Sequence, residues 1–329
     1  MRTLVLLLLI GGLGVYGQKK VVVVGVSPAE LGELRQAAPG VNVVGVTAQE
    51  AAAQVADADG LIGPPSAEAL RAGKNLKWVQ SQSAGVERFA PELKGRPVVL
   101  TNCKIIQGPN IADHAMAMLL MLTRDLYSAK AAMAKEQWVR GQFHPIELTG
   151  KTAVIIGVGG IGMQIAQRAH GFGMNIIGVD PKEISYTYFL KQVVPPDRLD
   201  EVLPQADVIF VSAPLTEQSR RMVGARQFEL MKKGAYFVAV SRGGLYDTGG
   251  LVKALDEKRL RGAGLDVTDP EPLPPGHPLW KFDNVIITPH YAGQSDLVQR
   301  RRIDLYKENL RRFSKGETLL NVVDKDRGY

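Results

Sequence analysis

The sequence predicts a two-domain α/β protein in which a domain with a doubly wound parallel sheet is inserted into a second, smaller, flavodoxin-like α/β domain. The first observation is length, since 329 residues suffice for about two domains. The second is that short apolar runs alternate with helical stretches along most of the chain, which is typical of parallel sheets. The third is composition: 45% hydrophobic and 22% charged residues are ordinary for a globular protein with a large core.

Residues 1–18 do not fit this pattern. Met1 and Arg2 precede an apolar stretch at 4–15, and Gly17 could precede a cleavage site, so the segment looks like a signal peptide. The apolar stretch is shorter than the roughly 20 residues of a membrane span, so no stable membrane insertion is expected. The protein is exported to the periplasm if the segment is used, and is cytoplasmic otherwise. The alternatives to a signal peptide are that these residues form an extra N-terminal strand or that the start codon has been set too early.

Residues 19–110 are assigned to the smaller domain. Five apolar runs predict buried strands, with helical stretches between most of them, at 21–25, 41–46, 60–62, 76–80 and 98–101. The single cysteine, Cys103, excludes an intramolecular disulfide and a multi-cysteine metal site, and no metal is expected. Because Cys103 follows a strand-like run, a buried inert thiol is favoured over a catalytic one.

Residues 111–289 are assigned to the inserted domain. It opens with a mostly helical, Ala- and Met-rich run at 111–138, where methionines at this spacing indicate helix packing. An apolar run at 152–156 then leads into a glycine motif and a helix at 161–172, and a second apolar run at 175–179 ends on Asp180. The motif itself consists of Gly157, Gly159, Gly160, Ile161 and Gly162.

This strand–glycine–helix–strand–acid unit is the Rossmann pattern that binds a dinucleotide. Gly157 permits the tight turn, Gly159 admits the pyrophosphate, and Gly162 lets helix and strand pack closely. The helix N-terminus offers free N–H groups to the phosphates. Asp180 can accept hydrogen bonds from the adenosine ribose and would repel a 2′-phosphate, so the sequence predicts NAD rather than NADP.

Three further side chains follow predicted strands of the inserted domain. Arg242 follows the run at 235–240, Glu271 lies just beyond the run at 262–267, and His290 ends the run at 284–290. Ligands of such sheets bind beyond the carboxyl ends of the strands, so the three are expected to meet in one cleft. A histidine can give or take a proton near neutral pH, a carboxylate can orient it, and an arginine can polarise a carbonyl and hold a carboxylate.

The chain resembles the D-isomer-specific 2-hydroxyacid dehydrogenases, of the glyoxylate/hydroxypyruvate reductase or phosphoglycerate dehydrogenase type. The resemblance rests on the glycine motif with Asp180 and on the segments 213–216, 241–244, 264–272, 278–280 and 288–290. It implies that His290 is the acid/base, Glu271 its partner and Arg242 the substrate-orienting residue. It also implies cofactor contacts from Pro214, from Asp266 and from backbone near Val240.

The resemblance further implies that backbone N–H groups around Ser83, Ala84 and Gly85 receive the substrate carboxylate. It implies a homodimer formed through the helical arm at about 119–139. The segment 184–194 and the pair Gly249–Gly250 depart from the family pattern, as does Ala239 where asparagine is frequent.

Residues 290–329 are assigned back to the smaller domain, with a final helix at 296–313. This helix carries much of the formal net charge of +7. A solvated helix face is favoured over a patch for nucleic acid or acidic membrane, because no nucleic-acid motif accompanies it.

The predicted function is NAD-dependent interconversion of a 2-oxo acid and a D-2-hydroxy acid. The alternative is an NAD(H)-sensing binding protein, like the corepressors built on the same fold. A formate dehydrogenase is disfavoured, because that group carries glutamine where Glu271 stands.

Overall fold

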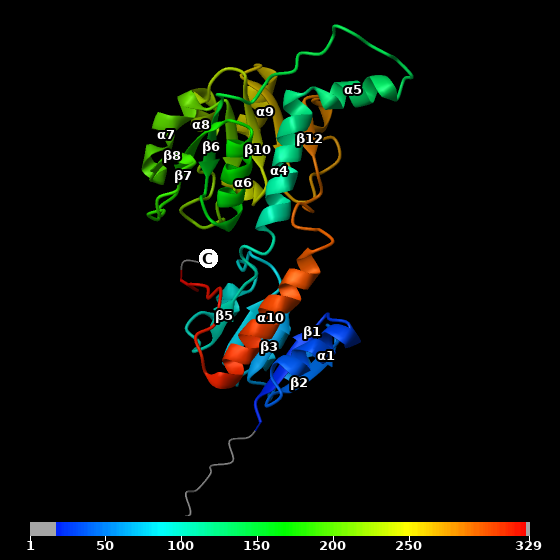
Figure 1. Cartoon of the computed structure of the whole chain (residues 1–329), viewed down its shortest axis with the longest axis vertical. Coiled ribbons are helices and arrows are strands. Elements are labelled where there is room, and N and C mark those ends of the chain that lie inside the picture. Colours follow the sequence, from blue (N-terminus) through cyan, green and yellow to red (C-terminus); the bar gives the residue numbers. More distant parts are fainter. Residues whose placement is uncertain (1–17, 327–329) are drawn as a thin grey trace, which may run out of the picture.

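The computed structural model describes residues 18–326, so the signal-like segment at 1–17 lies outside the described residues. Two parallel sheets stand one above the other along the long axis of the molecule (Figure 1). The smaller sheet has the strand order β2-β1-β3-β4-β5. Its strands are β1 (Lys20–Val24), β2 (Asn42–Val46), β3 (Gly60–Gly63), β4 (Trp78–Ser81) and β5 (Val99–Thr101). The helices between them are α1 (Pro28–Ala37), α2 (Ala51–Val55) and α3 (Ala67–Ala72).

The larger sheet has seven strands in the order β12-β11-β10-β9-β6-β7-β8, all paired in parallel. They are β6 (Thr152–Ile156), β7 (Asn175–Val179), β8 (Leu190–Val194), β9 (Val208–Val211), β10 (Ala235–Ala239), β11 (Leu260–Leu265) and β12 (Val285–Ile287). Its helices are α6 (Gly160–Gly171), α7 (Leu199–Val202), α8 (Ala225–Leu230) and α9 (Thr248–Asp256). The direction of winding reverses between β6 and β9, which creates the crevice where such sheets bind ligands. The predicted doubly wound sheet next to a smaller α/β domain is therefore confirmed.

The chain passes between the two sheets twice. It leaves the smaller sheet after β5 through α4 (Gly108–Thr123) and returns after β12 to α10 (Val298–Lys315). Helix α10 lies against α1 and the smaller sheet, with Ile303, Tyr306 and Leu310 in the same core as Trp78 of β4. The Trp78 and Phe313 rings are 5.1 Å apart.

The predicted helical run at 111–138 forms as two helices rather than one. Helix α4 ends at Thr123, and α5 (Leu126–Met133) begins after Asp125, whose φ of 57° is left-handed and cannot continue α4. The Asp125 carboxylate accepts a hydrogen bond from Ser128 Oγ at 2.6 Å, which stabilises the bend. Helix α5 projects from the body (Figure 1), and Met133 and Trp138 are 59% and 89% exposed.

The segment at 184–194, which departs from the family pattern, contains the edge strand β8. Its residues 190–194 pair with β7, and the pairing register shifts between Ile176 and Ile177. This strand was hard to predict because only Val194 in it is buried, so its residues lack the continuous apolar run of a central parallel strand.

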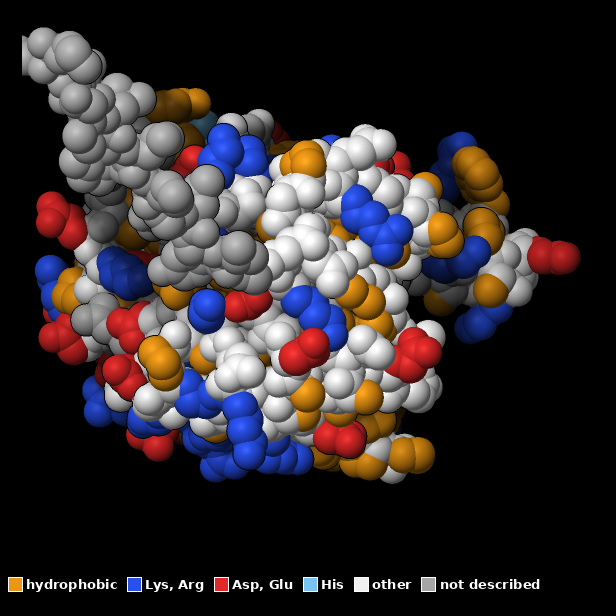
Figure 2. Space-filling view, turned by 90° about the horizontal axis from the view of Figure 1, so that it is seen from below, with side chains coloured by type: hydrophobic (Ala, Val, Ile, Leu, Met, Phe, Trp, Pro, Cys, Tyr) orange, Lys and Arg blue, Asp and Glu red, His pale blue; other side chains and the backbone are white. Residues whose placement is uncertain are grey.

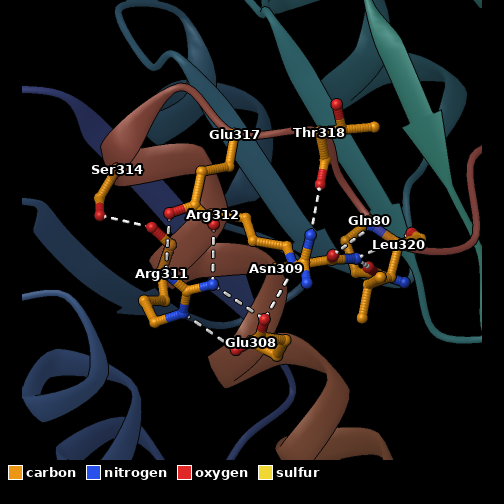
Figure 3. Close-up of polar contacts among 9 residues, drawn as sticks. All are labelled: Gln80, Glu308, Asn309, Arg311, Arg312, Ser314, Glu317, Thr318 and Leu320. Atoms are coloured by element: carbon orange, nitrogen blue, oxygen red, sulfur yellow. Dashed lines mark hydrogen bonds and ion pairs between the residues drawn. The ribbon is translucent and has the colours of Figure 1, made fainter.

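Four of the basic residues of α10 pair with carboxylates, while Arg301 and Arg302 donate to backbone carbonyls. Arg300 and Lys307 both pair with Glu33 of α1, and Arg311 and Arg312 both pair with Glu308 (Figure 3). The two arginines lower the pKa of Glu308 to about 2. Seen from below, Lys and Arg side chains are interspersed with Asp and Glu, although basic groups gather along one edge (Figure 2). The charge of these four basic residues is thus balanced by neighbouring carboxylates, which fits the expected solvated helix face better than a binding patch.

Within residues 18–326, no helix is both long enough and apolar enough to cross a bilayer. The same part of the chain contains no cluster of three or more His, Cys, Asp or Glu side chains arranged to hold a metal ion.

Candidate active site

The turn from β6 to α6 forms a glycine cradle. Gly157 has φ +90°, and a Cβ there would lie 2.5 Å from the backbone N and Cα of Ala213. A Cβ on Gly162 would overlap the Gly157 carbonyl, whereas open space surrounds Gly159. The cradle therefore needs glycine at two positions for packing and leaves room at the third for a phosphate group. Gly160 and Ile161 form the first turn of α6, and Ile161 packs on the core rather than facing the cradle.

Asp180 lies beside this cradle at the end of β7. Its Oδ2 accepts a hydrogen bond from Val158 N at 2.9 Å, and its Oδ1 accepts one from Lys182 N at 2.9 Å. A cavity of about 500 Å³ extends from the cradle over Asp180 to Pro214. The carboxylate is thus held in one orientation at a place where the ribose of a dinucleotide would lie. The cradle, the acid and the cavity together fit an NAD-type cofactor.

His290 and Glu271 lie 19 residues apart in the sequence, in the loops that follow β12 and β11, but their side chains are in direct contact. His290 Nδ1 lies 2.9 Å from Glu271 Oε2, and Glu271 Oε1 accepts a hydrogen bond from Thr268 N at 3.1 Å. One carboxylate oxygen thus holds the histidine ring, and the other is held by the backbone and keeps the carboxylate in place. Because Nδ1 faces Glu271, Nε2 is the nitrogen left to exchange a proton with a ligand. The predicted pair is therefore present geometrically.

A second cavity, of about 780 Å³, lies between the two domains and brings the predicted residues together. Arg242, Glu271 and His290 line it from the larger domain. Ser83 and Gly85 line it from the loop that follows β4 in the smaller domain. A Cβ on Gly85 would overlap the Arg242 guanidinium, so this loop and Arg242 can approach each other only because residue 85 is glycine.

The loop after β4 offers fewer free donors than the sequence suggested. The Ser83 N–H donates to Ser81 Oγ at 3.1 Å, and the Ala84 carbonyl accepts from Asn102 Nδ2 at 2.7 Å. Within the described chain, no acceptor takes the N–H of Ala84 or Gly85. Ala84 is not among the residues that line this cavity, and the Ser83 N–H is already engaged. An anion in the cavity would therefore meet the Gly85 N–H and Arg242.

Two of the predicted cofactor residues lie deeper than expected. Val240 is 4% exposed and its N–H donates to Val211 O at 3.2 Å, so that N–H is not available to a ligand. Asp266 is 2% exposed, and its carboxylate is already hydrogen bonded to the backbone that follows His290. Cys103 is fully buried, and burial raises the pKa of its thiol to about 11, as an inert thiol requires.

Glu87 also lines the interdomain cavity, although the sequence did not indicate a role for it. Its Oε1 accepts a hydrogen bond from Arg242 Nε at 2.6 Å, while Arg242 Nη1 donates to Ser241 O at 2.7 Å. Burial opposes ionisation of Glu87, but the guanidinium outweighs it and lowers the pKa of that carboxyl. Glu87 belongs to the smaller domain and Arg242 to the larger one, so their ion pair crosses the cleft. The available signal was a charged residue two positions after Gly85, beyond the end of a strand.

Known proteins resemble this chain in sequence and in fold. Residues 116–292 match the model of the family "D-isomer specific 2-hydroxyacid dehydrogenase, NAD binding domain". The chain is 33% identical over 290 residues to a glyoxylate reductase of Korarchaeum cryptofilum, covering 83% of this chain and 85% of that one. The chain belongs to the D-isomer-specific 2-hydroxyacid dehydrogenase family. It is thus an oxidoreductase with an NAD-binding domain.

One further relative is longer than this chain, and one structural neighbour was solved with a bound cofactor. The dehydrogenase is 34% identical over 303 residues to a D-3-phosphoglycerate dehydrogenase of Methanocaldococcus jannaschii, covering 90% of this chain but only 56% of that protein's length. A D-isomer-specific 2-hydroxyacid dehydrogenase from Xanthobacter autotrophicus Py2, solved with NADPH and MES, superposes with a TM-score of 0.81 at 26% identity. That comparison covers 95% of this chain and all of the other.

Proposed function

We propose that this dehydrogenase interconverts a 2-oxo acid and a D-2-hydroxy acid with His290 as its acid/base. The observation that carries the proposal is the interdomain cavity, which the His290–Glu271 pair and Arg242 line together. Glyoxylate, hydroxypyruvate and a phosphoglycerate-like acid are the leading substrates. Glyoxylate reductase and phosphoglycerate dehydrogenase relatives support these candidates.

The chain's own groups account for binding and proton transfer. When bound, the nicotinamide cofactor supplies the hydride that the carbonyl carbon receives. Arg242 Nη2 and the Gly85 N–H, which both face this cavity, hold the substrate carboxylate and orient the adjacent carbonyl. His290 Nε2 gives its proton to the carbonyl oxygen during reduction and takes it back during oxidation. Glu271 keeps the imidazole in position for both directions.

We propose NAD as the preferred cofactor. The support is Asp180, whose negative charge is held beside the cradle by two backbone N–H groups and would oppose a 2′-phosphate. The neighbour from Xanthobacter was solved with NADPH, so NADPH is the alternative against which this proposal must be tested. Of the predicted contacts, Gly157, Gly159, Asp180 and Pro214 line the cavity.

We also propose a homodimer formed through the projecting arm. The support is a groove along α5 and the segment after it, which is lined by apolar side chains including Met133, Trp138 and Phe143. Trp138→Asp should convert a dimer into a monomer in sedimentation velocity, whereas a wild-type monomer would contradict the proposal.

The test of the activity is His290→Ala with a panel of 2-oxo acids. Its kcat should fall by about a hundredfold or more, the usual contribution of a general acid. The Kd of NADH, measured by nicotinamide fluorescence, should stay within twofold. Near wild-type turnover would remove His290 from the proton-transfer role. Tight NADH binding by a wild-type protein that reduces no member of the panel would favour the alternative, an NAD(H)-sensing protein.

A further inference from the structure

The turn that carries His290 has an unusual backbone. His290 has φ +51°, a left-handed conformation that costs a residue with a side chain free energy and persists only where neighbours enforce it. Its N–H donates to the carbonyl of Asp266 at 2.9 Å. Something in the surrounding structure must therefore hold residues 288–292 in place.

The Asp266 carboxylate is the centre of that hold. It accepts hydrogen bonds from Thr288 Oγ1 at 2.6 Å, from Tyr291 N at 3.1 Å and from Ala292 N at 3.1 Å. These donors lie on both sides of His290 in sequence. One buried carboxylate thus grips the turn at both ends, and its side chain is only 1% exposed.

A third residue, His114 of α4, completes the chain of contacts. Its Nε2 lies 3.0 Å from Thr288 Oγ1 and 3.7 Å from Asp266 Oδ1. The Thr288 hydroxyl has one hydrogen, which it gives to Asp266, so His114 Nε2 must be the donor to Thr288. The His114 ring also meets the Tyr291 ring edge-on at 5.0 Å, and its side chain is 16% exposed.

Helix α4 is a firm base for this contact. It packs along α6 and β11, and a Cβ on Gly264 of β11 would lie 2.8 Å from Met118 Cβ. On the same face as His114, Asn110 Nδ2 donates to Ala292 O at 3.0 Å and Gln107 Nε2 donates to Gly293 O at 3.2 Å. Side chains at positions 107, 110 and 114 follow the helical repeat, so one face of α4 holds the whole segment after His290.

We propose that His114, Thr288 and Asp266 are positioning residues, which hold the turn at 288–292 so that His290 stays directed at Glu271 and the cavity. The kinetic part rests on the proposed function. The structural part does not, because it concerns the order of the turn itself. Asp266 is thereby given a task for its carboxylate besides the cofactor contact that the family resemblance implies.

The test uses Thr288→Val, an isosteric change that removes the central hydroxyl, and His114→Ala, with His114→Gln as the variant that retains a donor. Thr123→Val is the matched control. Thr123 is a buried threonine of α4, the helix that carries His114, and its hydroxyl has no hydrogen-bond partner among the described residues. Hydrogen–deuterium exchange of the peptide containing Tyr291 and Ala292 gives a readout that does not depend on turnover.

We expect exchange at this peptide to rise at least about fivefold in Thr288→Val and His114→Ala, and kcat to fall about tenfold or more, as misplacement of a general acid would cause. The KM of the 2-oxo acid and the Kd of NADH should stay within threefold, and His114→Gln should recover part of kcat. Because both residues act through one chain, the double variant should lose no more than Thr288→Val alone.

Wild-type exchange and kcat in both single variants would overturn the proposal. Faster exchange with unchanged kcat would overturn the positioning role. Equal effects of Thr123→Val would show that loss of a buried hydroxyl outside the chain of contacts has the same result, which also contradicts the proposal. A wild-type protein that reduces no 2-oxo acid would instead refute the proposed function, and the exchange result would still decide whether the clamp exists.

Discussion

Removal of the Asp180 carboxylate should change cofactor choice by an amount that the structure allows one to estimate. Asp180→Ala deletes the negative charge and the acceptor that would bind the ribose, and it frees the N–H groups of Val158 and Lys182. Loss of a hydrogen bond to a charged group costs about 1.5–3 kcal/mol, so kcat/KM with NADH should fall roughly tenfold to a hundredfold.

The same substitution should improve the use of NADPH. Two unit charges about 5 Å apart repel by about 0.8 kcal/mol in bulk water and by about 3 kcal/mol at an effective dielectric constant of about 20. Relief of that repulsion corresponds to a gain of about fourfold to two hundredfold in kcat/KM. Together the two changes should reduce the ratio of NADH to NADPH efficiency at least about fortyfold.

The assay is kcat/KM with both cofactors at fixed 2-oxo acid, supported by both Kd values from fluorescence. Glu229→Ala is the control, since it removes one exposed negative charge from α8 of the same domain, away from the cradle. An unchanged ratio in Asp180→Ala would refute the role assigned to Asp180. A wild-type enzyme that favours NADPH would refute both that role and the NAD proposal.

Three other substitutions or reactions test the remaining assignments. Arg242→Lys, which replaces a planar fork by a point charge, should raise the KM of the 2-oxo acid tenfold or more while the Kd of NADH stays within twofold, and equal losses would place Arg242 in the cofactor site. Because the pKa of Cys103 is raised to about 11, about one thiol in a thousand is ionised at pH 8, so Ellman's reagent should react only after unfolding. The pKa of Glu308 is lowered to about 2, so its ion pairs stabilise the fold above the ordinary value of 4.5 and are lost as pH falls toward 2; Glu308→Gln should flatten the dependence of Tm on pH across that window.

The parts of the site that depend on the local order of strands, turns and helices could be predicted from the sequence. The glycine cradle and Asp180 follow from one strand–turn–helix–strand unit, and the meeting of His290 with Glu271 follows from the rule that parallel strands end at one edge. These predictions needed no knowledge of side-chain direction.

The parts that depend on packing could not be predicted. The Glu87–Arg242 ion pair requires the distance between two domains, and the Asp266 clamp requires the direction of a buried carboxylate. The bend at Asp125 could not be predicted, because neither glycine nor proline marks it in the sequence. Aspartate adopts the left-handed conformation only where local contacts support it, and those contacts are not visible in the sequence. Contacts between distant segments are set by the assembled fold, which a single sequence does not display.

The place of α10 in the chain has a consequence for synthesis on the ribosome. All five strands of the smaller sheet precede residue 102, but Ile303, Tyr306 and Leu310, which share a core with Trp78, emerge about two hundred residues later. At 5–20 residues per second, that interval lasts roughly 10 to 40 seconds. Throughout it, the face of the nascent sheet that carries Trp78 has α1 but lacks α10, and the larger domain can fold in the meantime. The order of translation therefore makes this exposed face, rather than the catalytic cleft, the surface on which chaperone binding during synthesis should concentrate.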